Sequence, residues 1–307
     1  MSEKQYNSIL EVLDAFPDEA ACVEHLAAIR WPHGIICPWC AEARSFSRLS
    51  RGHRFRCNDC RQDFSVRKGT AFEDSKLPLR KWFVAMWLYG EHRKGISSVQ
   101  LARDVGVTQK TAWFMLGRLR KISEQMNSYG GPLSGTVEAD ETYLGGLEKN
   151  KHASERKGLG RGAVGKTPVA GVRERGGRVH AEPVESASSE HLVPFVRRHV
   201  AEGSALYTDE WGAYRRMGRH YGHSTVAHSA GRYVDGDVST NSIESFWALV
   251  KRSYIGVYHW WSPKHTHRYM AEHTARFNMG RAPGCRRLDD LLGMAAGARL
   301  TYAELIA

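Results

Sequence analysis

The sequence predicts an α/β catalytic domain preceded by a cysteine-rich module and a helical module. Three observations indicate this: two CxxC pairs lie within residues 31–70, amphipathic helical patterns dominate residues 71–130, and strand-like alternation begins after residue 135. The stretch 128–135, rich in glycine, proline and serine, marks the main boundary. We therefore divide the chain into N-terminal helices (1–30), the cysteine-rich module (31–70), the helical module (71–130), the α/β domain (131–281) with a basic, glycine-rich insertion (145–166), and a C-terminal tail (282–307).

Composition points to a soluble protein with a polyanionic partner. The 307 residues are 42% apolar, and the formal charge is +11 with a pI near 9.4. A charge of this sign and size favours nucleic acid as the partner. No run of about 20 apolar residues is present, so no membrane span is expected. The first residues lack the pattern of a signal peptide, and we expect a cytoplasmic protein.

The cysteine-rich module carries the strongest local motif. Cys37 and Cys40 form one CxxC turn, and Cys57 and Cys60 form a second turn after sixteen intervening residues. Each turn directs two thiolates at one tetrahedral centre, so the spacing predicts a zinc ribbon with one structural Zn²⁺. A metal-free thiol cluster or a redox CxxC is the alternative. The module is also basic and contains three phenylalanines, which suits contact with DNA or docking to a protein: Phe46, Phe55 and Phe64.

Within the helical module, residues 97–116 have the layout of a helix-turn-helix. Ser97 or Ser98 is placed to cap the first helix, Gly106 to form the turn, and Thr108 to cap the second helix. Short helical hairpins with a glycine turn also occur without DNA. The charge balance favours DNA binding, in which the second helix presents three side chains to a major groove: Gln109, Lys110 and Arg118.

The α/β domain places two aspartates on predicted strands. Residues 136–144 alternate in polarity, which sets Glu138, Asp140 and Thr142 on one face. Residues 169–184 predict a hairpin, 189–200 a helix, 205–209 a short strand that ends in Asp209, and 225–229 a further strand. Acids at the carboxyl end of a strand often serve sites in α/β folds, whereas acids along a solvated edge strand need no function.

Residues 239–255 predict an amphipathic helix with a second, polar face. Asn241, Glu244 and Lys251 share that face, while an apolar stripe runs along another. Asn241 and Glu244 have the spacing of a capping box, which is the plainer interpretation. Because Asp140 and Asp209 precede this helix in the order strand, strand, helix, we favour Glu244 as the third carboxylate of a metal site and Asn241 as the N-cap. The element order is that of a ribonuclease-H-like fold.

Several motifs together resemble those of ISXO-like insertion-sequence DDE transposases, of the Merlin-related branch. They are CPWC and CNDC (37–40, 57–60), VEADETYLGG (137–146), LYTDEWGAY (206–214), STNSIESFWALVKR (239–252) and GVYHWWSPKHTHRYMAEHTARFN (256–278). The resemblance covers the chain from about residue 31 to residue 281. It implies an enzyme that binds terminal inverted repeats and catalyses DNA cleavage and strand transfer, in a bacterial cytoplasm and bound to the nucleoid.

The resemblance also implies roles for individual residues. Asp140, Asp209 and Glu244 would hold two Mg²⁺ (or Mn²⁺) ions, and Lys251 would meet a phosphate. Some relatives use asparagine as the third residue, which makes Asn241 the alternative to Glu244. The resemblance also implies further DNA contacts by His259, His265 and Arg276. Processing two ends of double-stranded DNA implies at least a homodimer.

Two other functions fit the same modules. A zinc ribbon and a helix-turn-helix suffice for a DNA-binding regulator with an inactive ribonuclease-H-like domain, but such a regulator has no need of the acid set. A different nuclease of the same fold ranks third, since two recognition modules indicate defined DNA ends.

Overall fold

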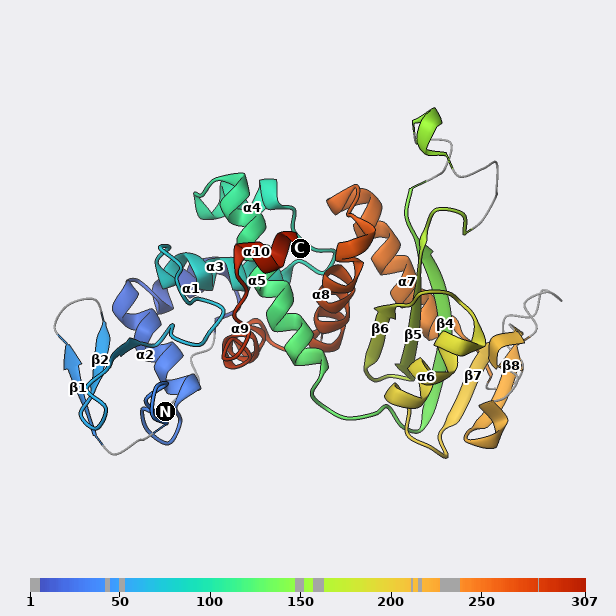
Figure 1. Ribbon diagram of the computed structural model, residues 1–307, viewed down its shortest axis with the longest axis horizontal. Helices are drawn as coiled ribbons and strands as arrows, with labels where there is room; N and C mark the ends of the chain where they lie inside the picture. The colour runs from blue at the N-terminus through green and yellow to red at the C-terminus, as the bar shows by residue number, and fades with distance from the viewer. Residues whose placement is uncertain are drawn as a thin grey trace. The chain divides into compact units, whose positions relative to one another are not determined.

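The chain forms two compact units in the computed structural model, which describes residues 6–41, 45–49, 53–146, 152–156, 163–210, 212–214, 217–226, 238–280 and 282–307 (Figure 1). Unit 1 comprises Met1–Met126 and Arg281–Ala307, and unit 2 comprises Asn127–Gly280. The expected tail 282–307 therefore belongs to the same unit as the N-terminal modules. Of the basic insertion 145–166, residues 147–151 and 157–162 lie outside the described residues.

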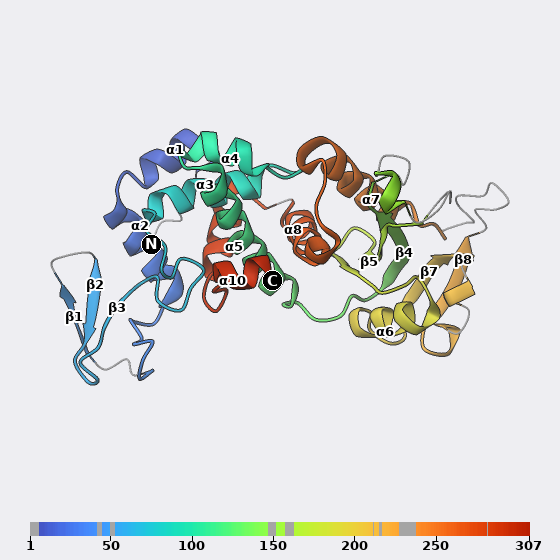
Figure 2. The ribbon, with the colours of Figure 1, turned by 45° about the horizontal axis from the view of Figure 1, so that its top comes forward.

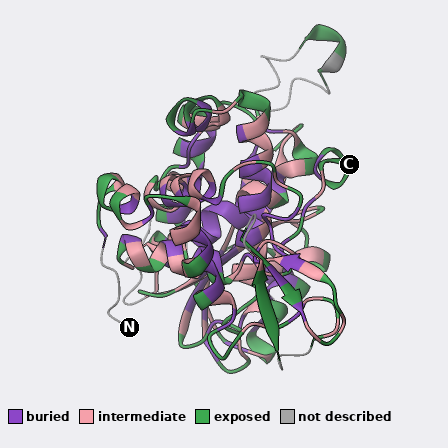
Figure 3. Cartoon of the chain, turned by 90° about the vertical axis from the view of Figure 1, so that its left-hand side faces the viewer, coloured by how far each residue is buried: buried purple, intermediate pink, exposed green. Residues whose placement is uncertain are grey.

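Unit 1 is mainly helical and packs around α3. Trp82, Phe83 and Met86 of this helix are each at most 1% exposed, because its apolar positions recur at helical spacing on more than one face. Figure 3 shows buried and exposed residues mixed along the helices. The helices are α1 (Ile9–Ala15), α2 (Glu19–Arg30), α3 (Leu79–Glu91), α4 (Ser98–Val105), α5 (Gln109–Asn127), α9 (Gly284–Gly293) and α10 (Tyr302–Ile306).

The C-terminal residues join unit 1 through the backbone. The Ala71 N–H donates to the Ala295 carbonyl at 2.9 Å, and the Gly297 N–H donates to the Gly69 carbonyl at 2.8 Å. Helix α9 packs against α2 and α3. These long-range contacts have no local sequence signature, which is why residues 282–307 were expected to form a separate tail.

The cysteine-rich module forms a three-stranded antiparallel sheet in the order β1-β2-β3. The strands are β1 (Phe46–Leu49), β2 (Arg54–Cys57) and β3 (Asp63–Ser65). Phe55 and Phe64 are directly paired across β2 and β3, and the Trp31 ring meets both edge-on. This aromatic cluster is the small apolar core of the module.

Unit 2 is built on a five-stranded mixed sheet in the order β6-β5-β4-β7-β8. Strand β4 is central: it pairs antiparallel with β5 and parallel with β7, and β8 adds in parallel to β7. The strands are β4 (Thr136–Leu144), β5 (Thr167–Glu174), β6 (Val179–Pro183), β7 (Ala205–Asp209) and β8 (Gly222–Val226). Strand β8 begins three residues before the expected 225–229, and residues 227–229 lie outside the described residues.

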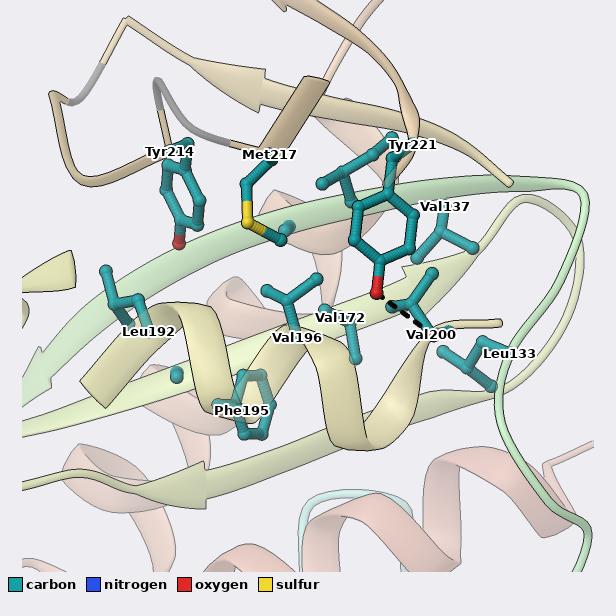
Figure 4. Close-up of a cluster of buried hydrophobic side chains, with 13 residues drawn as sticks. Leu133, Val137, Val172, Leu192, Phe195, Val196, Val200, Tyr214, Met217 and Tyr221 are labelled. Carbon is teal, nitrogen blue, oxygen red and sulfur yellow. Dashed lines mark hydrogen bonds between the residues drawn. The ribbon is translucent and has the colours of Figure 1, made fainter. Parts of the chain in front are cut away.

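Helices cover both faces of this sheet (Figure 2). On one face α6 (Ser189–His199) buries Leu192, Phe195 and Val196 against β4, β5 and β7 (Figure 4). The Tyr221 hydroxyl closes this cluster by donating to the Val200 carbonyl at 3.2 Å. On the other face α7 (Asn241–Ser253) and α8 (Thr266–Met279) pack over β4, β5 and β6.

Short helical turns complete unit 2. Helix α7 continues into a π-helix, η6 (Tyr254–Tyr258), and α8 is preceded by η7 (Pro263–His265). The remaining turns are η2 (Ala153–Glu155), η3 (Gly212–Tyr214) and η4 (Met217–Arg219). Among the described residues, no helix combines the length and the hydropathy needed to cross a membrane.

A buried histidine makes the stability of unit 2 sensitive to acid. His180 of β6 is 8% exposed and stacks on His199 with ring centroids 4.8 Å apart. Burial, reinforced by the neighbouring charge of His199, lowers the pKa of His180 to about 4. The unfolded chain takes up a proton below about pH 6.5, whereas the folded chain resists protonation until about pH 4.

We therefore expect the free energy of unfolding to fall by up to about 3 kcal/mol as the pH drops through this interval. His180→Phe removes the titrating group, and its unfolding free energy should depend less on pH over the same range. Urea denaturation at several pH values measures both slopes, and parallel slopes for the two proteins would contradict the assignment.

Candidate functional site

The four predicted cysteines meet at one point in unit 1. The sulfurs of Cys37 and Cys60 are 3.7 Å apart, as are those of Cys40 and Cys57, and all four lie within 4.8 Å of one another. In the described part of the chain, no other group of three or more His, Cys, Asp or Glu is drawn together as tightly. Hairpin β1–β2 brings the second CxxC turn back to the first.

The sulfur arrangement fits a tetrahedral Zn²⁺ site. A Zn–S bond of about 2.3 Å gives an S···S separation of about 3.8 Å in a regular tetrahedron, close to the two measured distances. Burial alone would raise the pKa of the Cys37 thiol, but the backbone N–H groups of Trp39 and Cys40 lower it to about 7, which favours the thiolate. A bound zinc would stabilise this small module by roughly 10 kcal/mol.

A second site lies where strands β4 and β7 separate. Their parallel pairing aligns Thr136 with Ala205 and Glu138 with Tyr207, and it stops there. If this register is extended by two residues, Asp140 lies opposite Asp209. Both aspartates are half-buried and stand at the point where the two strands no longer hydrogen-bond. The carboxyl ends of parallel strands, beyond the last paired residues, are where α/β sheets place their ligands.

Helix α7 adds Glu244 to the two aspartates. Glu244 is exposed in the first turn of the helix, and the Thr240 hydroxyl donates to its Oε1 at 3.2 Å. Burial chiefly, together with the negative charges of Asp209 and Glu244, raises the pKa of Asp140 to about 6. Asp209 and Glu244 therefore both lie near enough to Asp140 for their charges to act on it, although the three carboxylates are spread more widely than the four sulfurs. We call Asp140, Asp209 and Glu244 the acid site.

The expected capping role of Asn241 is wrong. Thr240 occupies the N-cap position of α7, and Asn241 is exposed as the first helical residue. The Ile243 N–H, which a capping side chain would bind, donates instead to Oε2 of Glu138 at 2.9 Å. Glu138 is fully buried on β4, so the strand itself caps the helix.

Two arginines, Arg173 of β5 and Arg175 in the turn directly after it, complete this attachment. Arg175 donates from Nε to Oε1 of Glu138 at 3.1 Å and also to the Ser239 hydroxyl at 2.7 Å. Arg173 donates to the Ser245 hydroxyl at 2.8 Å and to the Ser242 carbonyl. The start of α7 is thus held to the sheet by charged hydrogen bonds, which restrict where Glu244 can lie.

A glycine brings α7 close enough for a tryptophan to reach the acid site. Trp247 donates from Nε1 to Oδ2 of Asp140 at 3.0 Å. Gly171 of β5 pairs directly with Asp140, and a Cβ at this position would lie 2.5 Å from Cζ2 of Trp247. Only glycine leaves room for the indole. Trp247 therefore orients the Asp140 carboxylate from the opposite side to Asp209.

Glu141 is a further carboxylate near the acid site, and the sequence motifs did not indicate it. The buried Tyr214 of η3 donates to its Oε2 at 3.1 Å, and burial with the charges of Asp140 and Asp209 raises its pKa to about 7. The bond ties the loop after Asp209 to the strand that carries Asp140. The one sequence signal for Glu141 is its position directly after Asp140.

The predicted DNA-contact residues differ in their accessibility. Gln109 and Lys110 are exposed at the start of α5, Lys251 is exposed on α7, His259 is exposed and His265 half-buried. The structure does not support the DNA contacts expected of Arg118 and Arg276. Arg118 is 5% exposed and donates to the carbonyls of Leu300, Ala71 and Glu73, while Arg276 is 5% exposed and forms a buried ion pair with Glu272.

Comparison with known proteins gives a consistent picture. Residues 132–278 match the ISXO2-like transposase domain, and residues 17–63 match the transposase zinc-ribbon domain. The chain is also similar to a Halobacterium salinarum protein, described as an uncharacterized protein in transposable element ISH50. The two are 31% identical over 306 residues, which covers 92% of this chain and 99% of the relative. No solved structure matches the chain.

The sulfur geometry predicts that zinc binding requires all four cysteines. We expect one zinc per chain in the purified protein and a loss of most of it in Cys57→Ser, because three thiolates no longer close the tetrahedron. Metal analysis by mass spectrometry measures the stoichiometry. Cys285→Ser, which alters a cysteine outside the cluster, is the matched control and should keep its zinc. Full zinc content in Cys57→Ser would refute the site.

The close approach of α7 predicts that Gly171 tolerates no side chain. Gly171→Ala should lower the free energy of unfolding by about 1–3 kcal/mol, because the new methyl group displaces the Trp247 indole. Gly146→Ala is the matched control, since a Cβ there meets no atom within 4 Å. Urea denaturation of both variants tests the difference, and equal stability of the two would show that the indole moves without cost.

Proposed function

The chain belongs to the ISXO2-like transposases, and from this premise we propose that it binds the terminal inverted repeats of its insertion sequence and catalyses metal-dependent cleavage and strand transfer there. The observation that carries the proposal is the acid site: a half-buried Asp140, with Asp209 and Glu244 near enough to raise its pKa. A half-buried carboxylate beside two other negative charges costs stability unless a cation binds there. A DNA-binding regulator would gain nothing from them.

The architecture supports this assignment. The sheet order β6-β5-β4-β7-β8, with an antiparallel hairpin on one side of β4 and parallel strands on the other, fits a ribonuclease-H-like catalytic domain. In unit 1, α4 and α5 are joined at Gly106, whose φ is +66°, and each begins at a capping hydroxyl, Ser97 and Thr108. These features support a helix-turn-helix.

The donors of the acid site suit a hard dication. Asp140, Asp209 and Glu244 offer only carboxylate oxygens, the ligands that Mg²⁺ and Mn²⁺ prefer. Two such ions, when bound, would activate the attacking water or DNA 3′-hydroxyl and stabilise the leaving oxygen of the phosphoryl transfer. We assign the third position to Glu244 rather than Asn241, because a carboxylate is the stronger ligand and the charge of Glu244 already acts on Asp140.

Neighbouring residues would prepare the site for this chemistry. The Trp247 N–H fixes the rotamer of Asp140, and the Glu138–Ile243 hydrogen bond fixes the turn of α7 that carries Glu244. Lys251 lies two turns further along the same helix face and is exposed, so its ammonium group can meet a phosphate of the bound strand. Positioning of this kind is the main contribution of a protein to phosphoryl transfer.

End recognition falls to unit 1 in this proposal. Gln109 and Lys110, at the exposed start of α5, would read a major groove, and the basic zinc ribbon would add phosphate contacts. Arg118 and Arg276 are not among the proposed DNA contacts, since both are buried. Because a mobile element has two ends, the active form would be at least a homodimer.

Removal of one acid should separate catalysis from binding. We expect Asp209→Asn to reduce Mg²⁺-dependent nicking of DNA from the element ends by roughly 10²-fold or more, because the loss of a charged ligand weakens metal binding. Binding to the same DNA should remain. A gel-based nicking assay and a binding assay on one duplex measure the two activities.

Two further variants complete this test. Glu202→Gln alters an exposed acid that precedes β7, at the other end of that strand from Asp209, and should nick normally. Glu244→Gln should lose activity while Asn241→Ala keeps it; the reverse result would transfer the third ligand to Asn241. Nicking that persists in Asp209→Asn would reject the acid site.

A further inference from the structure

The chain that follows α7 exposes two large apolar side chains. Trp260 and Trp261 are consecutive, yet Trp261 is 4% exposed and Trp260 is 63% exposed. Ile255, at the start of the π-helix η6, is 70% exposed. We call Ile255 and Trp260 the apolar tip. Solvent exposure of both residues, so close together in the chain, is unfavourable unless a partner covers them.

The backbone beneath the tip is firmly held. Trp261 stacks on Tyr269 with ring centroids 4.3 Å apart and meets Tyr254 edge-on at 4.5 Å. The Tyr258 hydroxyl donates to Glu272, whose carboxylate also pairs with Arg276 in the interior. Arg276, which was expected to contact DNA, therefore supports through Glu272 the segment from which Trp260 projects.

Local backbone strain accompanies this exposure. His259 has a φ of +60°, a conformation that residues other than glycine seldom adopt, and its Nδ1 lies 2.9 Å from the Ile255 carbonyl oxygen. A π-helix immediately precedes it. Strained backbone and π-helical turns both concentrate at functional sites. The exposed Trp260 follows His259 directly in the chain.

The charged residues that flank the apolar tip in the sequence are all basic. Between Glu244 and the buried Glu272 there is no aspartate or glutamate. The same stretch contains four basic residues and three histidines: Lys251, Arg252, Lys264 and Arg268, with His259, His265 and His267. Lys251 and Arg252 are exposed in the last turns of α7. An apolar tip in such a setting matches a polyanion with apolar faces, which describes DNA with an unpaired base.

Helix geometry relates the tip to the acid site. Eleven residues separate Glu244 from Ile255, and a rise of 1.5 Å per residue places them about 16 Å apart along the helix. At about 3.4 Å per nucleotide this distance corresponds to roughly five nucleotides.

We propose that the apolar tip binds DNA by stacking Trp260 on an unpaired base, with Ile255 as a wedge beside it, roughly five nucleotides from the phosphate at the acid site. This inference rests on the proposed function, since it requires DNA at the acid site. The tip would hold a strand end apart from its complement while Lys251 and Arg252 contact the backbone.

The test compares two forms of one duplex that spans the junction flanking the coding region. One form is fully paired, and the other carries a short run of T·T mismatches beside the junction. The wild-type protein should bind the mismatched form more tightly. Trp260→Ala should bind it about 5- to 100-fold more weakly, which is the range found when one base-stacking aromatic side chain is removed. Trp260→Phe, which keeps an aromatic face, should retain most of the affinity.

Controls separate this inference from the proposed function. Tyr129→Ala removes another aromatic side chain, 60% exposed, and should leave both affinities unchanged. If the wild-type protein binds neither duplex, the proposed function and the tip assignment both fail. If it binds and nicks DNA but Trp260→Ala keeps the preference for mismatches, the tip assignment alone fails. A change in oligomeric state of Trp260→Ala without DNA, with unaltered DNA affinity, would overturn it in favour of a protein interface.

Discussion

The packing of α7 against strands β4 and β5 is the contact on which the acid site depends. Ile243, Phe246, Trp247 and Val250 are all at most 3% exposed, and burial of each such side chain stabilises the fold by about 1.5–3 kcal/mol. Gly171 allows this contact to be close, so that the indole of Trp247 reaches the carboxylate on the neighbouring strand. One apolar contact therefore stabilises unit 2 and also sets the position of Glu244 relative to Asp140.

Carboxylates on β4 have two opposite electrostatic roles. Glu138 is fully buried but receives hydrogen bonds from Arg175 and from the Ile243 N–H, so its charge is balanced within the protein. Asp140, two residues later on the same face, has the Trp247 N–H as a neutral donor and faces the charges of Asp209 and Glu244. Burial chiefly, together with these charges, raises the pKa of Asp140 to about 6. Strand β4 thus carries one carboxylate, Glu138, whose charge is balanced within the protein, and another, Asp140, whose charge a bound cation would balance.

The basic residues of unit 1 show that a positive net charge does not identify which side chains are available to bind DNA. Arg118 lies on the helix that the sequence assigns to DNA, yet its guanidinium group holds the segment Ala71–Glu73 and the C-terminal Leu300 together. The C-terminal helices complete the core around α3 instead of forming a tail. The zinc-ribbon module has only a small aromatic core of its own, which is consistent with its dependence on four cysteines.

Local periodicity was sufficient for much of the fold and of the candidate site. Alternation along residues 136–144 placed Glu138 and Asp140 on one face, helical spacing placed Glu244 and Lys251 on another, and the CxxC spacing identified the four cysteines. Sequence motifs were also sufficient to identify the family, as the comparisons confirm. These features depend on residues that are neighbours in the chain, so a pattern can reveal them.

The tertiary structure alone decided which distant groups meet. It placed the Glu138 carboxylate, more than a hundred residues earlier in the chain, as the acceptor for the Ile243 N–H in the first turn of α7, and it left Asn241 in solvent. It also buried Arg118 and Arg276, added Glu141 to the neighbourhood of the acid site through Tyr214, and assigned residues 282–307 to unit 1. In each case the energy comes from contacts between segments far apart in sequence. Spacing along the chain specifies the face on which a side chain stands, but only the packed fold specifies what lies opposite that face.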